Sequence, residues 1–181
     1  MRGKGGRVPE HDRLARFEQA VLPYLPAAYN LARWLTRNNH DAEDVVQEAY
    51  LRAYRSFDRF RGGDGRAWLL AVVRNTCYTW LKQHRARAAP AVFDETIHGK
   101  GDEAMDPQRQ LERRGTQQLL REALEELPEE FREVVVLREM EGYSYKEIAA
   151  IAGIPLGTVM SRLTRARERL QRCLAPRLNE L

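Results

Sequence analysis

Apolar residues recur with helical spacing along most of the chain. Between positions 41 and 57 they form one broad helical stripe, which consists of Val45, Val46, Ala49, Tyr50, Ala53, Tyr54 and Phe57. A similar pattern over 14–36 is interrupted by Pro23 and Pro26, so we predict a short helix and then a longer one that begins near Pro26. Residues 66–85 predict a further helix with one apolar face, formed by Leu69, Val72, Val73, Thr76 and Trp80. No segment alternates convincingly with the period of a β-strand.

Breaks in this pattern separate the predicted helices. The segment 59–65 contains three glycines and an aspartate, so we expect a loop there. From residue 86 to about 114 the periodicity fails, and the segment contains Pro90, Gly99, Gly101 and Pro107. This composition indicates a linker. Helical spacing returns over 117–127, stops at Pro128 and resumes over 129–140.

The most specific local signal lies between residues 143 and 170. Ser144, followed by Glu147, is typical of a capping box, so we expect a helix to begin there. Gly153 suits a tight turn that brings this helix against a second one, and Pro155 is tolerated in the first turn of that second helix. The buried side of the second helix is expected to consist of Val159 and Leu163. Its other faces carry small polar and arginine side chains, which is typical of a helix-turn-helix that reads the major groove of DNA.

The pattern as a whole predicts an all-α fold. We expect two small helical domains joined by a flexible linker, the C-terminal one containing the helix-turn-helix. Their expected bounds are residues 10–87 for the first domain, 88–116 for the linker and 117–175 for the second domain.

The distribution of charge changes the picture. The chain has 30 Lys and Arg against 26 Asp and Glu, and 26 of the basic residues are arginine. Arginine favours recognition of phosphates and base edges over simple charge. Residues 1–85 carry a net +6 and residues 148–181 a net +4, whereas residues 119–147 between them carry −5. Two basic blocks separated by an acidic one suggest two contacts with a polyanion.

Composition and the absence of certain motifs also argue against a membrane or secreted protein, a metalloprotein and an enzyme. No apolar run is long enough to span a membrane, and no apolar segment follows the basic N-terminus, so we expect a cytoplasmic protein. Cys77 and Cys173 stand alone, and the four histidines have no metal-ligand spacing, so no metal or other cofactor is expected. Because no phosphate-binding loop, GxGxxG motif or nucleophile elbow is present, we do not expect an enzyme.

The first domain carries two polar faces of different character. The helix at 41–57 mixes acids, an amide and arginines opposite its apolar stripe, which would ordinarily be a solvated face. The next helix and its flanks, from 59 to 87, carry seven basic residues and one acid, with Trp68, Tyr78 and Trp80 among them. Basic side chains bind phosphates, and aromatic rings stack on unpaired bases. Trp68 and Trp80 could equally belong to the core.

Three segments in series carry a resemblance to a known family. They read DAEDVVQEAYLRAYRSFDRF, RAWLLAVVRNTCYTWLKQHR and LPEEFREVVVLREMEGYSYKEIAAIAGIPLGTVMSRLTRARERL. Over residues 14–87 and 117–173 the chain resembles an extracytoplasmic-function (ECF, group IV) sigma factor of bacterial RNA polymerase, within the sigma-70 family. The resemblance implies a protein that binds core polymerase, recognises promoter −35 and −10 elements, and melts the −10 region.

The resemblance also implies roles for particular residues. Docking on the β′ clamp helices of core polymerase is assigned to Asp44, Gln47, Glu48, Arg52 and Arg55, and the β subunit is implied as a further partner with no residues assigned to it. The −10 element is assigned to Phe60, Arg61, Arg66, Trp68, Arg74, Asn75, Tyr78 and Lys82. Asn75 matches the asparagine that contacts a non-template base, and its amide suits the edge of an adenine or cytosine. The acidic residues of the linker fit a nucleic-acid mimic only loosely.

The −35 element is assigned to the second helix of the helix-turn-helix, through Thr158, Met160, Ser161, Arg162, Arg165 and Arg167. Many relatives have a basic residue where this chain has Met160, so −35 specificity is expected to differ, or contact with a thymine methyl to replace a polar one. The implied partners are core RNA polymerase, promoter DNA and an anti-sigma factor. The main alternative is a stand-alone helix-turn-helix activator or repressor, which would leave the basic and aromatic helix at 66–85 unexplained.

Overall fold

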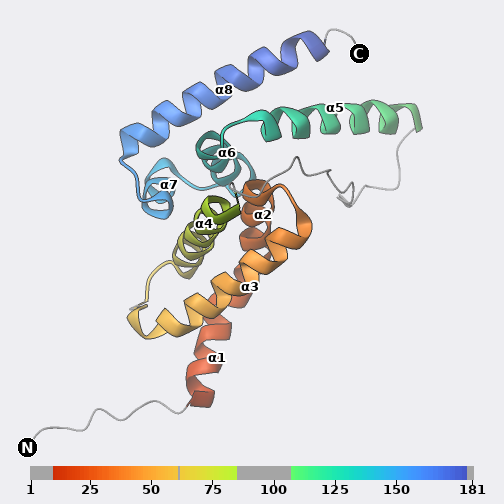
Figure 1. The fold of residues 1–181 in the computed structure, drawn as a ribbon. Helices are drawn as coiled ribbons and strands as arrows, with labels where there is room; N and C mark the ends of the chain where they lie inside the picture. Colours follow the sequence, from red (N-terminus) through yellow and green to blue (C-terminus); the bar gives the residue numbers. More distant parts are fainter. Residues whose placement is uncertain (1–9, 61, 85–106, 179–181) are drawn as a thin grey trace, which may run out of the picture.

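A computed structural model describes residues 10–60, 62–84 and 107–178. Within these ranges the chain is helical and contains no strand, which confirms the predicted all-α class. The elements, shown in Figure 1, are α1 (Glu10–Val21), η1 (Leu22–Tyr24), α2 (Leu25–Thr36), α3 (Asn39–Ser56), η2 (Phe57–Arg59), α4 (Gly65–His84), α5 (Pro107–Glu126), α6 (Glu129–Val135), η3 (Val136–Met140), α7 (Tyr145–Ala152) and α8 (Leu156–Leu178). Most of the expected linker lies outside the described residues.

Local sequence explains where the N-terminal helices begin and end. Pro26 occupies the first turn of α2, as predicted, and Pro23 occupies the first turn of η1, a short helical segment that was not predicted. Helix α2 ends at Thr36 and is followed by Arg37, which caps it in the left-handed conformation with φ 62°. The side chain of Asn38 then caps α3 by accepting a hydrogen bond of 3.1 Å from the backbone N–H of Asp41.

The N-terminal half is built from α2, α3 and α4, which pack against one another. Their buried face follows the predicted apolar stripes, with Val45 and Val46 from α3 and Leu69 and Val73 from α4. Helix α1 adds Phe17, whose ring meets three aromatic rings edge-on, those of Tyr50, Tyr54 and Phe57. The polar residues of α3 and α4 are therefore held on a rigid three-helix support.

The C-terminal half differs from the expectation in two places. Helix α5 begins at Pro107, earlier than the expected start at Gln117, because a proline at the first helical position is followed by good helix-forming residues. The predicted helix over 129–140 exists, but its second half, η3, is π-helical. A π-helical turn is a local widening that periodicity alone does not reveal.

The helix-turn-helix forms as predicted. Ser144 and Glu147 make both hydrogen bonds of a capping box, at 3.3 and 2.7 Å. Gly153 ends α7 with φ 66°, a conformation that other residues rarely adopt. Helix α7 packs on α8, whose buried side consists of Val159, Leu163 and Ala166. The other faces at the start of α8 are exposed and could contact a partner.

The two halves pack together. Helix α2 contacts α6, and α4 contacts α7 (Figure 1). The buried side chains of both halves form one continuous cluster. Arg132 of α6 is fully buried and donates to the backbone oxygen of Trp34 in α2 at 2.8 Å. It also donates to three carbonyls at the end of α5, those of Leu124, Glu125 and Leu127. One arginine thus caps α5 and joins the halves.

Candidate functional site

The polar face of α3 is the first candidate surface. Asp44, Gln47 and Arg55 are exposed on it. Glu48 accepts a hydrogen bond of 2.7 Å from Nε of Arg52, and this bond lowers the pKa of the Glu48 carboxyl. The five residues expected to contact a protein partner therefore lie along one accessible helix face, and two of them are already paired with each other.

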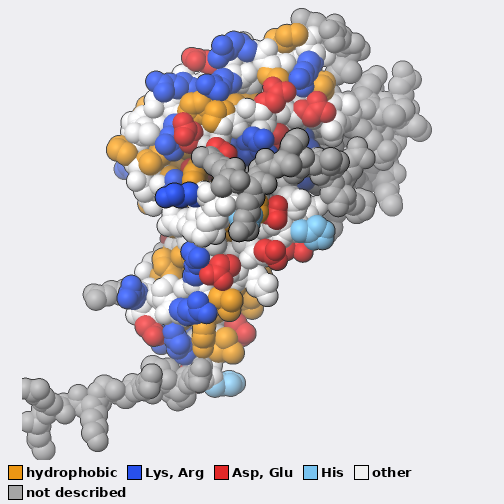
Figure 2. All heavy atoms as spheres, in the orientation of Figure 1, with side chains coloured by type: hydrophobic (Ala, Val, Ile, Leu, Met, Phe, Trp, Pro, Cys, Tyr) orange, Lys and Arg blue, Asp and Glu red, His pale blue; other side chains and the backbone are white. Residues whose placement is uncertain are grey.

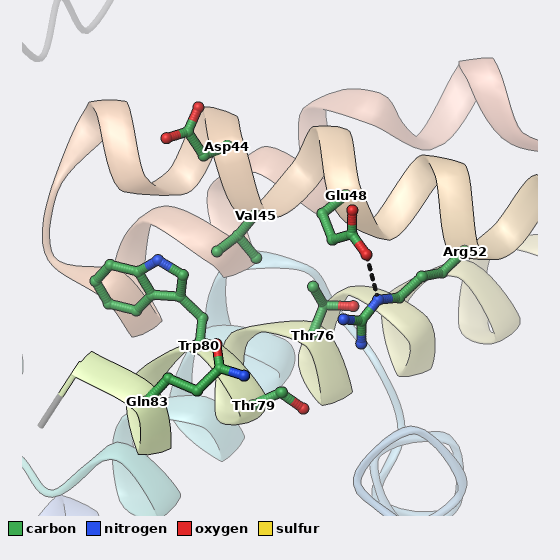
Figure 3. A pocket seen from close by; sticks show the side chains of 8 residues that line it. All are labelled: Asp44, Val45, Glu48, Arg52, Thr76, Thr79, Trp80 and Gln83. Atoms are coloured by element: carbon green, nitrogen blue, oxygen red, sulfur yellow. Dashed lines mark hydrogen bonds and ion pairs between the residues drawn. The ribbon is translucent and has the colours of Figure 1, made fainter.

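A groove runs beside this face, between α3 and α4. Figure 3 shows Asp44, Glu48 and Arg52 along one side and Thr79, Trp80 and Gln83 along the other. Trp80 is half-buried, and its ring stacks on His84 with centroids 4.1 Å apart. Trp80 is thus a wall of the groove as well as part of the apolar packing. The acidic side of the groove belongs to the same surface as the other polar residues of α3.

The loop before α4 is shaped by glycines. Gly62 and Gly63 have φ of 83° and 113°, which only glycine adopts readily. Gly65 starts α4 so close to α1 that an added Cβ would lie 2.8 Å from the backbone oxygen of Ala20. Asp64 accepts hydrogen bonds from the backbone N–H groups of the first turn of α4, at 2.9 and 3.1 Å. Arg61 lies outside the described residues.

Two of the predicted aromatic residues support this loop. Phe60 and Trp68 are half-buried, with ring centroids 4.9 Å apart. Both rings also lie against Phe57 in the core. Each therefore packs inward and presents only part of its ring to solvent.

Two other predicted residues of α4 are fully accessible. Asn75 and Lys82 are exposed. The amide oxygen of Asn75 accepts a hydrogen bond of 3.1 Å from Nη1 of the neighbouring Arg74, which leaves its amide N–H₂ pointing to no described partner. An exposed amide with a free N–H₂ donor, and an oxygen that can accept a second hydrogen bond, can read the edge of a base.

Three other predicted residues of α4, namely Arg66, Arg74 and Tyr78, face the C-terminal half. Arg74 donates through Nε to the Glu133 carboxylate, and the Tyr78 hydroxyl donates to the other Glu133 oxygen at 3.0 Å. Glu133 is fully buried, and burial raises its pKa. Arg66 donates to the backbone oxygen and the carboxylate of Glu141, at 2.9 and 3.0 Å. No pattern in the sequence indicated these partners.

The start of α8 is the second candidate surface. Met160, Ser161 and Arg165 are exposed and Thr158 is half-buried. Arg162 turns inward instead: it is half-buried, and its Nη1 is buried without a hydrogen-bond partner among the described residues. Figure 2 shows Lys and Arg side chains gathered along the edge that Figure 1 draws as α8.

One predicted residue of α8 is paired within the C-terminal half. Arg167 donates to the Glu139 carboxylate at 2.8 Å, and both side chains are exposed. This hydrogen bond raises the pKa of Arg167, which is charged in any case. Exposed pairs of this kind contribute little to stability, so Arg167 can exchange Glu139 for another anion at small cost.

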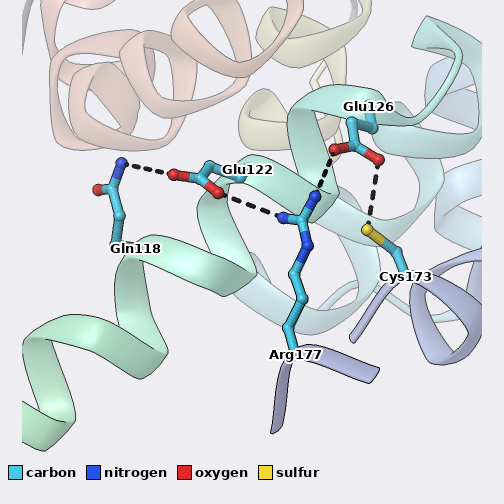
Figure 4. A network of polar contacts seen from close by, with 5 residues as sticks. All are labelled: Gln118, Glu122, Glu126, Cys173 and Arg177. Carbon is cyan, nitrogen blue, oxygen red and sulfur yellow. Dashed lines mark hydrogen bonds and ion pairs between the residues drawn. The ribbon is translucent and has the colours of Figure 1, made fainter. Parts of the chain in front are cut away.

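A polar network ties the far end of α8 to α5. Arg177 donates to Glu122 and Glu126, both at 3.2 Å, and the Cys173 thiol donates to Glu126 at 3.2 Å (Figure 4). The hydrogen bond to Glu126 raises the pKa of Cys173. The network orients α8 but presents no chemistry of its own. Among the described residues no cluster of side chains could hold a metal ion, and no helix is long and apolar enough to cross a membrane.

The fold and its surfaces define a helical DNA-binding protein with a helix-turn-helix. Two family matches specify it further: residues 20–87 match the family described as Sigma-70 region 2, and residues 117–170 match Sigma-70, region 4. The chain is 33% identical over 181 residues to the RNA polymerase sigma-H factor of Pseudomonas aeruginosa, a match that covers 96% of this chain and 93% of that protein. The chain therefore belongs to the sigma-70 family, in its ECF group, whose members act in transcription initiation.

Other relatives agree with this assignment. The ECF RNA polymerase sigma-E factor of Escherichia coli is 37% identical over 75% of each chain. The ECF sigma factor SigE of Mycolicibacterium smegmatis is 35% identical over 91% of this chain, which spans 63% of that longer protein. Among solved structures, the sigma factor RpoE in complex with the anti-sigma factor NepR from Bartonella quintana is similar with TM-score 0.70 and 32% identity, over 88% of this chain and 97% of that chain.

Proposed function

We propose that this chain directs core RNA polymerase to promoters by recognising a −35 and a −10 element and by melting DNA at the −10 element. The observation that carries the proposal is the pair of accessible reading surfaces on separate helices. Asn75 stands exposed on α4 among basic side chains, and the start of α8 is exposed on a helix-turn-helix. A stand-alone activator or repressor would need only the surface on α8.

We assign core polymerase to the polar face of α3. Asp44, Gln47 and Arg55 are exposed there, and the paired Glu48 and Arg52 border the groove toward α4. A face that mixes acids, an amide and arginines suits a protein partner better than DNA, because its carboxylates would repel phosphates. The β′ clamp helices are the implied partner, with the β subunit contacting the chain elsewhere.

We assign the −10 element to the loop before α4 and to α4 itself. The loop has glycines at positive φ, and the helix that follows carries Arg66, Arg74, Asn75 and Lys82. Bases that leave the duplex must be read on their edges or stacked on a ring, and Asn75 offers the edge contact. Phe60 and Trp68 present their partly exposed rings next to the loop.

We assign the −35 element to the first turns of α8. Ser161 and Arg165 are exposed toward solvent, and the exposed fraction of Met160 is 51%. A methionine cannot donate to guanine or phosphate, but its methyl and thioether groups can contact the methyl group of thymine. We therefore propose an apolar contact at the position where many relatives place a basic one. Thr158 and Arg167 flank this contact.

We also propose that an anti-sigma factor regulates this chain in the cytoplasm. Two solved structures similar to it hold such a complex: RpoE with NepR, and CnrH with the cytosolic domain of CnrY, the latter at TM-score 0.61 and 27% identity. The segment between α4 and α5 would act as the linker between the two domains, and one partner would contact both of them.

Run-off transcription with purified core polymerase tests this proposal. Genomic fragments serve as templates, and the transcripts are mapped to their start sites. We expect product only when the chain and core enzyme are both present, with a shared −35 and −10 motif upstream of the starts. Duplex binding by the chain alone, with no transcript in the presence of core enzyme, would instead favour the stand-alone helix-turn-helix regulator.

A further inference from the structure

The start of α8 presents two large apolar side chains to solvent, at an outer edge of the molecule beside α7 (Figure 1). The exposed fraction of Leu156 is 41% and that of Met160 is 51%. They stand four residues apart in the helix, so they are neighbours on one face. A single exposed leucine needs no explanation, but two neighbouring large apolar side chains on a reading helix form an apolar stripe. Leu156 is not among the residues that the resemblance assigns to the −35 element.

The hydroxyl groups beside this stripe offer no free donor. The Ser161 hydroxyl donates to the backbone oxygen of Thr158 at 3.0 Å. The Thr164 hydroxyl donates to the backbone oxygen of Met160 at 3.1 Å. Because each hydroxyl has one proton and uses it within the helix, Ser161 and Thr164 can accept a hydrogen bond from a base but cannot donate one. This part of the helix is therefore poorly equipped to read acceptor groups.

The surroundings of the stripe favour DNA as the surface that covers it. Residues 156–165 contain no acid that would repel phosphates, and Arg165 is exposed among them. Gly157 follows Leu156 and has open space where a side chain would stand, so nothing there holds the helix away from a groove. The N-terminal residues of a recognition helix are the ones that reach base edges in the major groove. Leu156 and Met160 stand at this end of α8.

The major groove offers one apolar group to such a stripe. Of the four bases only thymine carries a methyl group there, while the other base edges present hydrogen-bond donors and acceptors. Neither Leu156 nor Met160 can donate a hydrogen bond, so covering a polar base edge with them would leave that edge unpaired. A thymine opposite either side chain is favoured instead, because its methyl group and the side chain bury apolar surface against each other.

Spacing along the helix limits how far apart two such thymines can lie. Four residues of an α-helix rise by about 6 Å. Successive base pairs of a duplex lie about 3.4 Å apart along its axis. A helix that lies along the groove therefore places Leu156 and Met160 opposite positions about two base pairs apart at most.

We propose that Leu156 and Met160 together read the methyl groups of two thymines in the −35 element, about two base pairs apart at most. Leu156 is thereby a specificity-determining residue of the −35 site. The preference comes from burial of methyl groups and not from hydrogen bonds, while Arg165 contacts a neighbouring base or phosphate. The inference rests on the proposed function of α8, and it adds which base the helix selects and by which chemical group.

Deoxyuridine provides the test, because its base differs from thymine only in lacking the methyl group. Holoenzyme first selects duplexes from a library that is randomised over the −35 element, and sequencing of the bound fraction should show two thymines at the expected spacing. Each thymine is then replaced by deoxyuridine, singly and together, and the affinity of the holoenzyme is measured by titration. We expect a loss of about three- to fivefold for each methyl group, the factor that burial of one such group gives. Replacing a thymine outside the selected motif should change nothing.

Variants of the chain show which side chain reads which methyl group. Leu156→Ala and Met160→Ala change exposed residues to a good helix former, so both variants should fold. Each should lose its sensitivity to deoxyuridine at one position only, and the position should differ between the two. Met160→Leu keeps an apolar side chain and should keep the sensitivity. Gln171→Ala, exposed further along α8, is the control and should respond to deoxyuridine as the native chain does.

Three results would overturn the proposal while −35 recognition itself persists. The selected motif lacks a pair of thymines, or the thymine and deoxyuridine duplexes bind equally well. In the third, Leu156→Ala weakens binding to core polymerase without DNA and leaves both deoxyuridine effects intact, which would place Leu156 in a protein contact instead. Failure of the proposed function shows differently, because the native holoenzyme would then enrich no −35 sequence and yield no run-off product.

Discussion

Helices α4 and α8 carry similar chemistry but stand in different environments. Both present arginines, yet Arg66 and Arg74 of α4 are bonded to acidic residues of the other half, whereas Arg165 of α8 is exposed. Helix α8 packs on α5, α6 and α7 through its other side, which leaves Met160, Ser161 and Arg165 exposed, although Arg162 turns inward and Arg167 pairs with Glu139. Helix α4 uses part of its reading face for packing. The comparison shows that residues suited to bind DNA, such as Arg66 and Arg74, can also form the contacts between two domains.

The largest expected effect is a loss of stability when the contact between the two halves is broken. Arg132→Ala leaves the carbonyls of Trp34 and the end of α5 without their buried donor. We predict a loss of unfolding free energy on the order of 3 kcal/mol, measured by chemical denaturation. Arg172→Ala on the exposed side of α8 is the control and should stay within about 0.5 kcal/mol of the native chain. Equal stability of both variants would contradict the role given to Arg132.

The next largest effect is expected on DNA binding by α8. Arg165→Ala should weaken holoenzyme binding to a −35 duplex by about 1–3 kcal/mol, because an exposed arginine at this place can reach base edges or phosphates. A base contact would relax preference at one position, and a phosphate contact would weaken all duplexes alike. Gln171→Ala, further along α8, is the control in the same binding titration. Full affinity of the Arg165 variant would remove this residue from the −35 site.

The polar face of α3 is expected to bind core polymerase and no DNA, unlike the faces of α4 and α8. Reversing charge by Asp44→Lys with Glu48→Lys should weaken binding to core polymerase by about tenfold, since both residues border the exposed face of α3. Stability should hardly change because neither side chain is in the core. Asp12→Lys with Glu18→Lys on α1 is the charge-matched control. Unchanged co-elution of the α3 variant with core enzyme would refute the assignment.

A smaller difference concerns the two cysteines. Burial raises the pKa of Cys77 in α4 to about 12, so almost no reactive thiolate is present at neutral pH, whereas Cys173 in α8 is only half-buried. We predict that a maleimide adds once to the native chain, at Cys173, and twice in denaturant. Intact-mass spectrometry over time checks this, and equal labelling rates at the two thiols would contradict the packing of α4.

The features that could be predicted from the sequence are those that depend only on residues close together along the chain. Helix periodicity, the prolines near α2, the Ser144 capping box and the turn at Gly153 are local signals, and each appears where it was expected. The early start of α5 was missed because Pro107 was interpreted as part of a linker, although proline also begins helices well. The π-helical turn left no signal in the spacing of apolar residues.

The junction could not be predicted because it depends on contacts between distant residues. Arg132 and Glu133 stand inside the apolar run FREVVVL, and charged residues in such a run are the one sign of a buried polar contact. The sequence does not say that their partners are Trp34 in α2 and Arg74 in α4. For the same reason Arg66, Arg74 and Tyr78 were assigned only to DNA.

The most direct test of promoter melting by α4 is permanganate footprinting of the open complex with Asn75→Ala. Asn75 is exposed and alanine favours a helix, so the variant should fold, bind core enzyme and engage the −35 element. Thr79→Ala, one turn further along α4, is the control. We predict weakened reactivity of thymines near the start site and poor discrimination among −10 variants for Asn75→Ala alone. Normal thymine reactivity with unaltered −10 preference would show that the base is read elsewhere.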